Sequence, residues 1–287
     1  MIGLLLLNVL IVAIPASILG VLLVHRKAIM VADAISHSVL PGIVIAYILL
    51  PERNDLGLFV GAIICGMITT LLIDFFNKRL RLTFDVSIGV LFPVLFSIGI
   101  LLMAKYAGVN SDIDMECVLF GDLETTVLET IEWNGKVYGT LFFYRLLPIM
   151  IFLISMILIG FRTWQSWLFN SEFLSIKGFK IEFMQLLLML LLSVFSVVSF
   201  EGVGVVMVLG LLILPAATSL LFVRDLKQNF IYSACIGIVS SIGGVLLGIY
   251  FDISIAPCVT LVNAVVFSLL LIYFVLKNKT KVVLPQK

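Results

Sequence analysis

Charged residues are scarce in this sequence: they make up 12% of its 287 residues, against 62% for hydrophobic residues. Apolar runs of about 20 residues, long enough to cross a bilayer, recur between the few charges. The net charge of +1 says little, because the informative quantity in a membrane protein is where the charges lie along the chain. The composition therefore predicts a polytopic membrane protein and excludes a nucleic-acid partner.

Other absences narrow the class further. No internal repeat and no linker divides the chain, so residues 1–287 are expected to form a single transmembrane domain. The four Cys residues include no CxxC pair, and neither a disulfide nor a zinc site is expected. No G-x-x-x-x-G-K-[ST] loop is present to hold nucleotide phosphates, so we do not expect this chain to be an enzyme that hydrolyses ATP.

Nine apolar segments lie between the charged breaks, and we predict an all-α fold in which eight or nine of them span the membrane. The first segment has no basic leader and no obvious cleavage site, so it is expected to be a retained helix. The segments are residues 3–24, 28–50, 57–77, 84–104, 141–161, 181–200, 203–222, 230–250 and 255–276.

If each of these segments crosses the membrane, the loops between them lie alternately on its two sides, and the positive charges divide unevenly between these sides. Fourteen of the 18 Lys and Arg residues fall on one side, and the other side has Arg53, Lys105, Lys136 and Arg145. By the positive-inside rule the richer side is cytoplasmic. This places the N-terminus outside the cell and the C-terminus inside.

One predicted span carries an unusual pair of polar residues, Asp33 and His37. Their spacing of four puts both on one face of a helix, where they can meet the same ligand. A carboxylate inside a span is costly and normally faces a cavity or a partner. Coordination of a divalent transition metal and proton relay both fit an oxygen and an imidazole nitrogen. An aspartate that only holds the histidine ring inside a packed bundle is an equally good reading of these two residues alone.

The residues around the pair add to this picture. Pro41 and Gly42 are expected to interrupt the helix soon after His37, and broken helices at membrane depth tend to line cavities. His25, the other histidine, directly precedes Arg26 and Lys27 at a predicted cytoplasmic helix end, and we interpret it as an interfacial anchor.

Four stretches, in order, resemble the integral-membrane permeases of the ABC-3 family, which belong to bacterial ATP-driven importers for manganese, zinc or iron(II). The stretches are ADAISHSVLPG (residues 32–42), FDVSIGVLFPVLFSIGILL (84–102), VLFGDL (118–123) and VGVVMVLGLLILPAATSLLF (203–222). The resemblance covers essentially the whole chain. It implies a permease fold like that of type II ABC importers.

The resemblance also implies roles for particular residues. Asp33 and His37 match the aspartate and histidine that the family uses to coordinate metal in its translocation path. Residues 169–180, FNSEFLSIKGFK, are similar to the family's cytoplasmic coupling segment, in which Glu172, Phe173 and Gly178 match. This chain has Asn170-Ser171 where Asp-Pro or Asp-Glu is usual, although Asn and Ser are both good helix caps. An ordinary interfacial helix with Trp164 and Trp167 in the aromatic belt explains the region as economically.

The partners implied by the resemblance are a pair of cytoplasmic ABC ATPase subunits, a second permease subunit of the same or a related kind, and an extracytoplasmic metal-binding protein. No permanently bound cofactor is expected; the divalent metal is the cargo, ATP is used by the partner subunit, and the location is the bacterial cytoplasmic membrane. Two other functions remain open: a proton-coupled secondary transporter, and an ABC permease for a metal chelate such as cobalamin. The ligand types do not distinguish manganese, zinc and iron(II).

Overall fold

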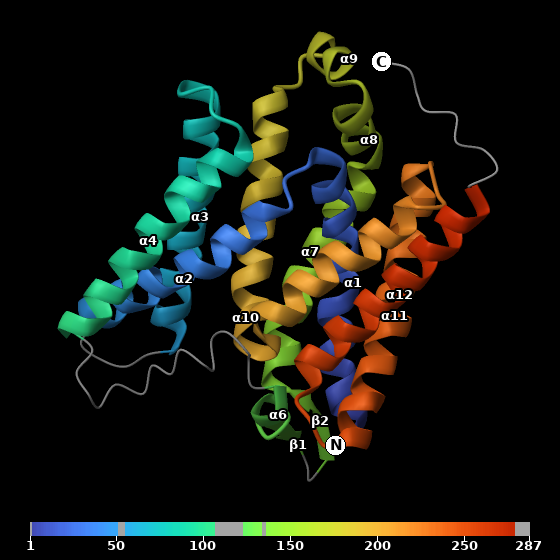
Figure 1. The fold of residues 1–287 in the computed structure, drawn as a ribbon. Coiled ribbons are helices and arrows are strands. Elements are labelled where there is room, and N and C mark those ends of the chain that lie inside the picture. The colour runs from blue at the N-terminus through green and yellow to red at the C-terminus, as the bar shows by residue number, and fades with distance from the viewer. Residues whose placement is uncertain (1, 51–54, 107–122, 134–135, 279–287) are drawn as a thin grey trace.

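The computed structural model describes residues 2–50, 55–106, 123–133 and 136–278 (Figure 1). In this part of the chain nearly all regular structure is helical, which confirms the predicted all-α class. The elements are α1 (Ile2–Arg26), α2 (Met30–Leu49), α3 (Asp55–Arg79), α4 (Phe84–Tyr106), α6 (Leu123–Thr126), β1 (Thr130–Trp133), β2 (Lys136–Thr140), α7 (Leu141–Ile159), α8 (Phe161–Phe169), α9 (Ser171–Ile176), α10 (Ile181–Leu220), α11 (Leu226–Phe251) and α12 (Ile255–Asn278).

Within the described ranges, nine helical segments are long and apolar enough to cross a membrane. They match the nine predicted segments, because a backbone in hydrocarbon must satisfy its hydrogen bonds internally and the helix is the local way to do so. The segment at the start of α11 begins at Leu226, four residues before the predicted residue 230. The extra turn contains Lys227. A charged residue ended the predicted apolar run, but it is tolerated at a helix end that lies at the membrane surface.

Two of these spans belong to α10, whose 40 residues are divided at Gly204. Gly204 has φ 77° and ψ 161°, a conformation that residues with a Cβ rarely adopt. Near this glycine, Gly202 lies against the ring of Phe142 at the start of α7. Further along the second arm, Leu212 and Ala216 lie against Gly20, in the C-terminal half of α1. The chain reverses around Gly204, and the two arms of α10, which correspond to the candidate spans Ile181–Phe200 and Gly202–Leu220, therefore run in opposite directions.

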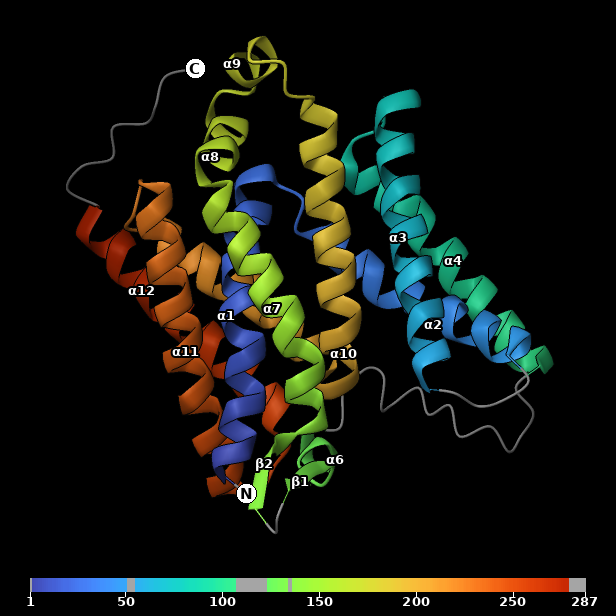
Figure 2. The same ribbon diagram turned by 180° about the vertical axis from the view of Figure 1, so that it is seen from behind.

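The helices fall into two groups joined by the first arm of α10. Helices α2, α3 and α4 pack on one another on one side, and α11 and α12 pack together on the other (Figures 1 and 2). Helix α1 packs against α7, α10 and α11, and most of its residues from Asn8 to Leu23 are buried. Helix α1 and the two arms of α10 therefore form the centre of the bundle.

A two-stranded hairpin is the one departure from helix among the described residues. Strands β1 and β2 pair antiparallel beside the N-terminal end of α1. The buried Asn8 of α1 donates to the Thr126 hydroxyl over 3.2 Å and accepts from the Thr140 hydroxyl over 2.5 Å. These hydrogen bonds fix the hairpin to this end of the bundle, opposite the end that carries α9.

Candidate metal site

The turn between α1 and α2 determines where Asp33 lies. Lys27 adopts a left-handed φ of 55°, its N–H donates to the Val24 carbonyl, and the Ala28 N–H donates to the Leu23 carbonyl. This is the Schellman arrangement that ends a helix, here formed by Lys in place of the usual Gly. It lets α2 begin at Met30, so Asp33 lies in its first turn.

Asp33 and His37 lie on one face of α2, as the spacing predicts. Asp33 Oδ1 and His37 Nε2 are 3.7 Å apart, too far for a good hydrogen bond but close enough for one ion to contact both. The Asp33 side chain is 43% exposed and that of His37 is 25% exposed. An aspartate that only fixed the histidine ring would be closer and more buried, so the packing interpretation is the weaker of the two.

The two neighbouring serines leave the Asp33 carboxylate free for other partners. The hydroxyl of Ser36 donates to the backbone carbonyl of Asp33, and that of Ser38 donates to the carbonyl of Ile35. Both hydroxyls thus satisfy helix backbone, as serine commonly does in spans.

Two phenylalanines of α4 hold the His37 ring. The ring centroids of Phe92 and Phe96 lie 4.4 Å and 5.5 Å from that of the imidazole. Sequence reasoning missed both residues, although their spacing of four within the predicted span 84–104 places them on one helix face. The aromatic contacts restrict how the imidazole can turn and leave its edge directed toward Asp33.

The predicted interruption of α2 after His37 is wrong, because the helix continues through Pro41 and Gly42 to Leu49. Close neighbours support it on both sides: Gly42 lies against the backbone of Gly61 in α3, and Pro41 lies against Gly99 in α4. Pro41 has no N–H, so the α-helical hydrogen bond that would end on the His37 carbonyl is absent. The site therefore lies on a continuous helix that carries one weakened turn.

The described residues contain no group of three or more His, Cys, Asp or Glu side chains that could hold a metal. Asp33 and His37 offer two groups that could act as ligands, fewer than the four to six that divalent transition metals usually take. The stretch VLFGDL, one of the motifs noted above, lies outside the described residues except for Leu123, as do Asp112, Asp114, Glu116 and Asp122.

The predicted coupling segment, residues 169–180, runs from the last residue of α8 through α9 to Lys180, at the end of the bundle opposite the hairpin (Figure 1). Asn170 caps α9, because its side chain accepts from the Phe173 N–H over 3.1 Å. Gly178, with φ 83°, closes the same helix. Glu172 and Phe173 are exposed, whereas Leu174 is buried. The segment is a short capped helix whose acidic and aromatic side chains face outward.

Aromatic contacts join α8 to the end of α1. The Arg26 guanidinium lies 4.1 Å from the ring centroid of Trp167, and the His25 ring makes an edge contact with Phe169 at 5.5 Å. Trp164 and Trp167 are buried, so they are not lipid-facing belt residues. His25 anchors α1 to α8, and its Nδ1 lies 2.8 Å from the Val21 carbonyl.

Together these features define a polytopic helical membrane protein with a carboxylate and an imidazole exposed on one spanning helix. The chain matches the ABC 3 transport family over residues 2–274, and it belongs to that family. It is accordingly a multi-pass protein of the cell membrane with the fold of an ABC transporter permease.

Curated relatives and a solved structure agree with this assignment. The chain is 31% identical to the manganese transport system membrane protein MntC of Halalkalibacterium halodurans over 258 residues, covering 90% of this chain and 82% of that protein. It is 29% identical to the zinc transport system membrane protein TroD of Treponema pallidum, covering 92% and 71%. PsaBC from Streptococcus pneumoniae, solved in complex with Fab, has a similar fold with a TM-score of 0.76, 25% identity and coverage of 96% and 95%.

Proposed function

We propose that this chain is the permease subunit of an ATP-driven importer for a divalent transition metal ion, manganese or zinc in particular. The ion passes Asp33 and His37, which exchange part of its water shell for a carboxylate oxygen and an imidazole nitrogen. One observation carries the proposal: both side chains face the same side of α2, partly exposed and only 3.7 Å apart. The transport systems of MntC and TroD support the choice of metals.

The incomplete ligand set favours a transient site shared by two permease subunits. One chain offers two ligands, so a second copy would bring the number to four, and water would complete the shell. Helix α4, which flanks the site, leaves many apolar side chains exposed, among them Val90, Val94, Ile98 and Leu101. A second permease covering this face would bring the two pairs together and take the half-exposed Asp33 out of lipid.

Energy for uphill transport comes from a separate pair of ATPase subunits that dock on α9. The outward side chains of Glu172 and Phe173 form the docking surface, and Gly178 gives the sharp turn that returns the chain to the bundle at Lys180. An extracytoplasmic binding protein delivers the metal on the side of the hairpin, and alternating access moves it inward. The N-terminus lies outside and the C-terminus inside, as the distribution of Lys and Arg requires.

Metal uptake by the assembled transporter tests the proposed site. Asp33→Asn and His37→Gln keep side-chain size while removing a ligand, so each should lower manganese or zinc accumulation by at least about tenfold. The control is Asp225→Asn, which removes an exposed carboxylate from the start of α11. Cell-associated metal is measured by mass spectrometry, together with the amount of assembled complex in the membrane.

Uptake unchanged in both site variants would reject the metal path. Transport by the chain alone in liposomes under a proton gradient would instead favour a secondary transporter that uses the same two residues as a proton relay.

A further inference from the structure

The first arm of α10 is buried on almost every side but leaves one stripe uncovered. Most of its residues from Met184 to Phe200 are fully buried, including Met184, Leu188 and Leu192. The exceptions recur at helical spacing on a single face. This α10 stripe consists of Phe183, Leu186, Leu187, Leu190 and Val194.

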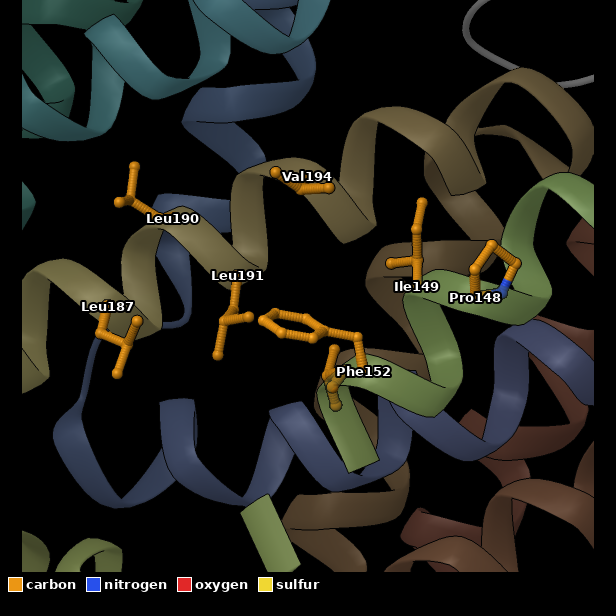
Figure 3. Close-up of a pocket in the computed structure, with 8 residues that line it drawn as sticks. Pro148, Ile149, Phe152, Leu187, Leu190, Leu191 and Val194 are labelled. Carbon is orange, nitrogen blue, oxygen red and sulfur yellow. The ribbon is translucent and has the colours of Figure 1, made fainter. Parts of the chain in front are cut away.

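One end of the α10 stripe enters an apolar groove. The groove has a volume of about 370 Å³, and α7 forms its other wall with Pro148, Ile149 and Phe152 (Figure 3). Its lining contains no polar side chain. Such a groove at membrane depth suits a hydrocarbon chain and offers nothing to a hydrated ion or a polar ligand.

The other end of the α10 stripe meets a charged cleft between α3 and α10. This cleft, of about 640 Å³, is lined by Leu71, Asp74, Phe75, Lys78, Arg79, Lys180, Glu182, Phe183 and Leu186. Phe75 and Phe183 are 53% and 59% exposed, which is expected of side chains that face lipid and not of the walls of an aqueous vestibule.

The charges of this cleft leave an excess of one cation. Asp74 accepts from Lys78 over 2.6 Å and from Gln185 over 3.0 Å, so both of its oxygens have partners. Among the described residues, Arg79 and Lys180 are in no ion pair, and the Glu182 carboxylate lies in the first turn of α10, where the helix dipole favours it. A phosphodiester with a single negative charge would neutralise the cleft.

The length of the α10 stripe fits the hydrocarbon chain of a lipid that carries such a phosphodiester. Eleven residues separate Phe183 from Val194, which is about 16 Å along a helix. Half of a bilayer's hydrocarbon core is about 15 Å thick. The stripe thus begins at the charged membrane surface and ends near the midplane, as an acyl chain of one leaflet does.

We propose that the chain binds one anionic glycerophospholipid on the first arm of α10. Its phosphate contacts Arg79 and Lys180, and an acyl chain follows the α10 stripe into the groove beside α7. The metal path is not involved, so the proposal stands apart from the transport function.

Lipid binding to the purified full-length chain tests this proposal. Native mass spectrometry would count adducts of phosphatidylglycerol and of phosphatidylcholine with the same acyl chains. The wild-type chain should prefer phosphatidylglycerol, and Arg79→Gln with Lys180→Gln should weaken that binding by about tenfold or more, since both cations that contact the phosphate are lost. Arg79→Lys with Lys180→Arg should restore it.

Two further variants separate the head group from the tail. Arg224→Gln with Lys227→Gln removes two exposed cations from the α11 end and should leave phosphatidylglycerol binding unchanged. Leu190→Trp fills the groove and should weaken both lipids alike, with the preference between them retained. Thermal unfolding of each variant checks that it is folded.

Three outcomes would overturn the proposal. They are no preference for phosphatidylglycerol in the wild-type chain, an equal loss in the Arg224/Lys227 variant, or dissociation of the permease dimer in the Arg79/Lys180 variant with lipid adducts unchanged. The last result would make this face a contact between protein subunits.

Discussion

At the scale of single residues, the proposed site combines two weak ligands with two aromatic neighbours. The 3.7 Å separation of Asp33 and His37 leaves both groups able to bind a third partner, and Phe92 and Phe96 limit the motion of the imidazole. Preorganisation of this kind lowers the entropic cost of metal binding, because the imidazole is already held in place. Each chain supplies only two of the proposed ligands, so an ion held by one subunit alone is released more readily than an ion held by both.

Phe92→Ala tests the role of the aromatic neighbours. Ring packing contributes about 0.5–1.5 kcal/mol, so losing it should raise the metal concentration for half-maximal uptake by about two- to tenfold. The maximal rate should change little because both ligands remain. Val265→Ala, at an exposed position of α12 away from the site, is the control. An unchanged half-maximal concentration would show that α4 does not position the imidazole.

At the scale of elements, the reversal inside α10 depends on one glycine. Gly204 joins two antiparallel spans, and its φ of 77° allows the chain to turn without a loop between them. The neighbouring Gly202 lies against the Phe142 ring, so there is little space for the turn to relax. The reversal therefore depends on glycine at this one position, at the hairpin end of the bundle.

Gly204→Ala should destabilise the chain by about 1–3 kcal/mol, the usual cost of a sparsely populated backbone conformation. Thermal unfolding of the purified chain in detergent measures this. Gly89→Ala is the control, since Gly89 is helical and nothing lies within 4 Å of an added Cβ there. That variant should be neutral or slightly stabilising. Equal stability of the two variants would mean that the turn in α10 does not require glycine.

The proposed coupling segment also depends on single residues, Asn170 and Gly178, at the two ends of α9. Asn170→Ala removes the cap of α9, which typically costs about 1 kcal/mol, and exposes the Phe173 N–H. We expect weaker association with the ATPase subunits and a lower rate of metal-dependent ATP hydrolysis. Asn170→Asp, which also caps well, should restore both. Full activity in Asn170→Ala would show that α9 need not be a helix before the ATPase docks.

At the scale of the whole molecule, the nine membrane-length helical segments of the described residues run between two opposite ends of the bundle. The hairpin and the N-terminus lie at one end of the bundle, and α9 lies at the other (Figures 1 and 2). The excess of Lys and Arg falls on the α9 side, which predicts that α9 is cytoplasmic.

Labelling of single cysteines tests this orientation. In a chain without its four native cysteines, Glu129→Cys should react with a membrane-impermeant maleimide added to intact cells. Ser175→Cys, on the exposed side of α9, should react only after the cells are opened. The reverse pattern would invert the orientation and with it the direction of transport.

Much of this architecture could be predicted from the sequence because hydropathy is a strong local signal. The nine spans agree within a few residues, and the spacing of Asp33 and His37 predicted their common face. The continuation of α2 through Pro41 could not be predicted, since it depends on Gly61 and Gly99, which lie on other helices. The contacts of Phe92, Phe96 and the buried Trp167 likewise depend on tertiary packing. No local sequence pattern determines which two helices pack against each other.

The compact turn at Lys27 has a mechanical consequence. Arg26, which rests on Trp167 of α8, and Asp33 are seven positions apart, and a hydrogen-bonded turn with half a helical coil on either side leaves no slack between them. A displacement of α8 would therefore be transmitted through this rigid turn to Asp33, and it would change the orientation of the carboxylate that we propose as a metal ligand.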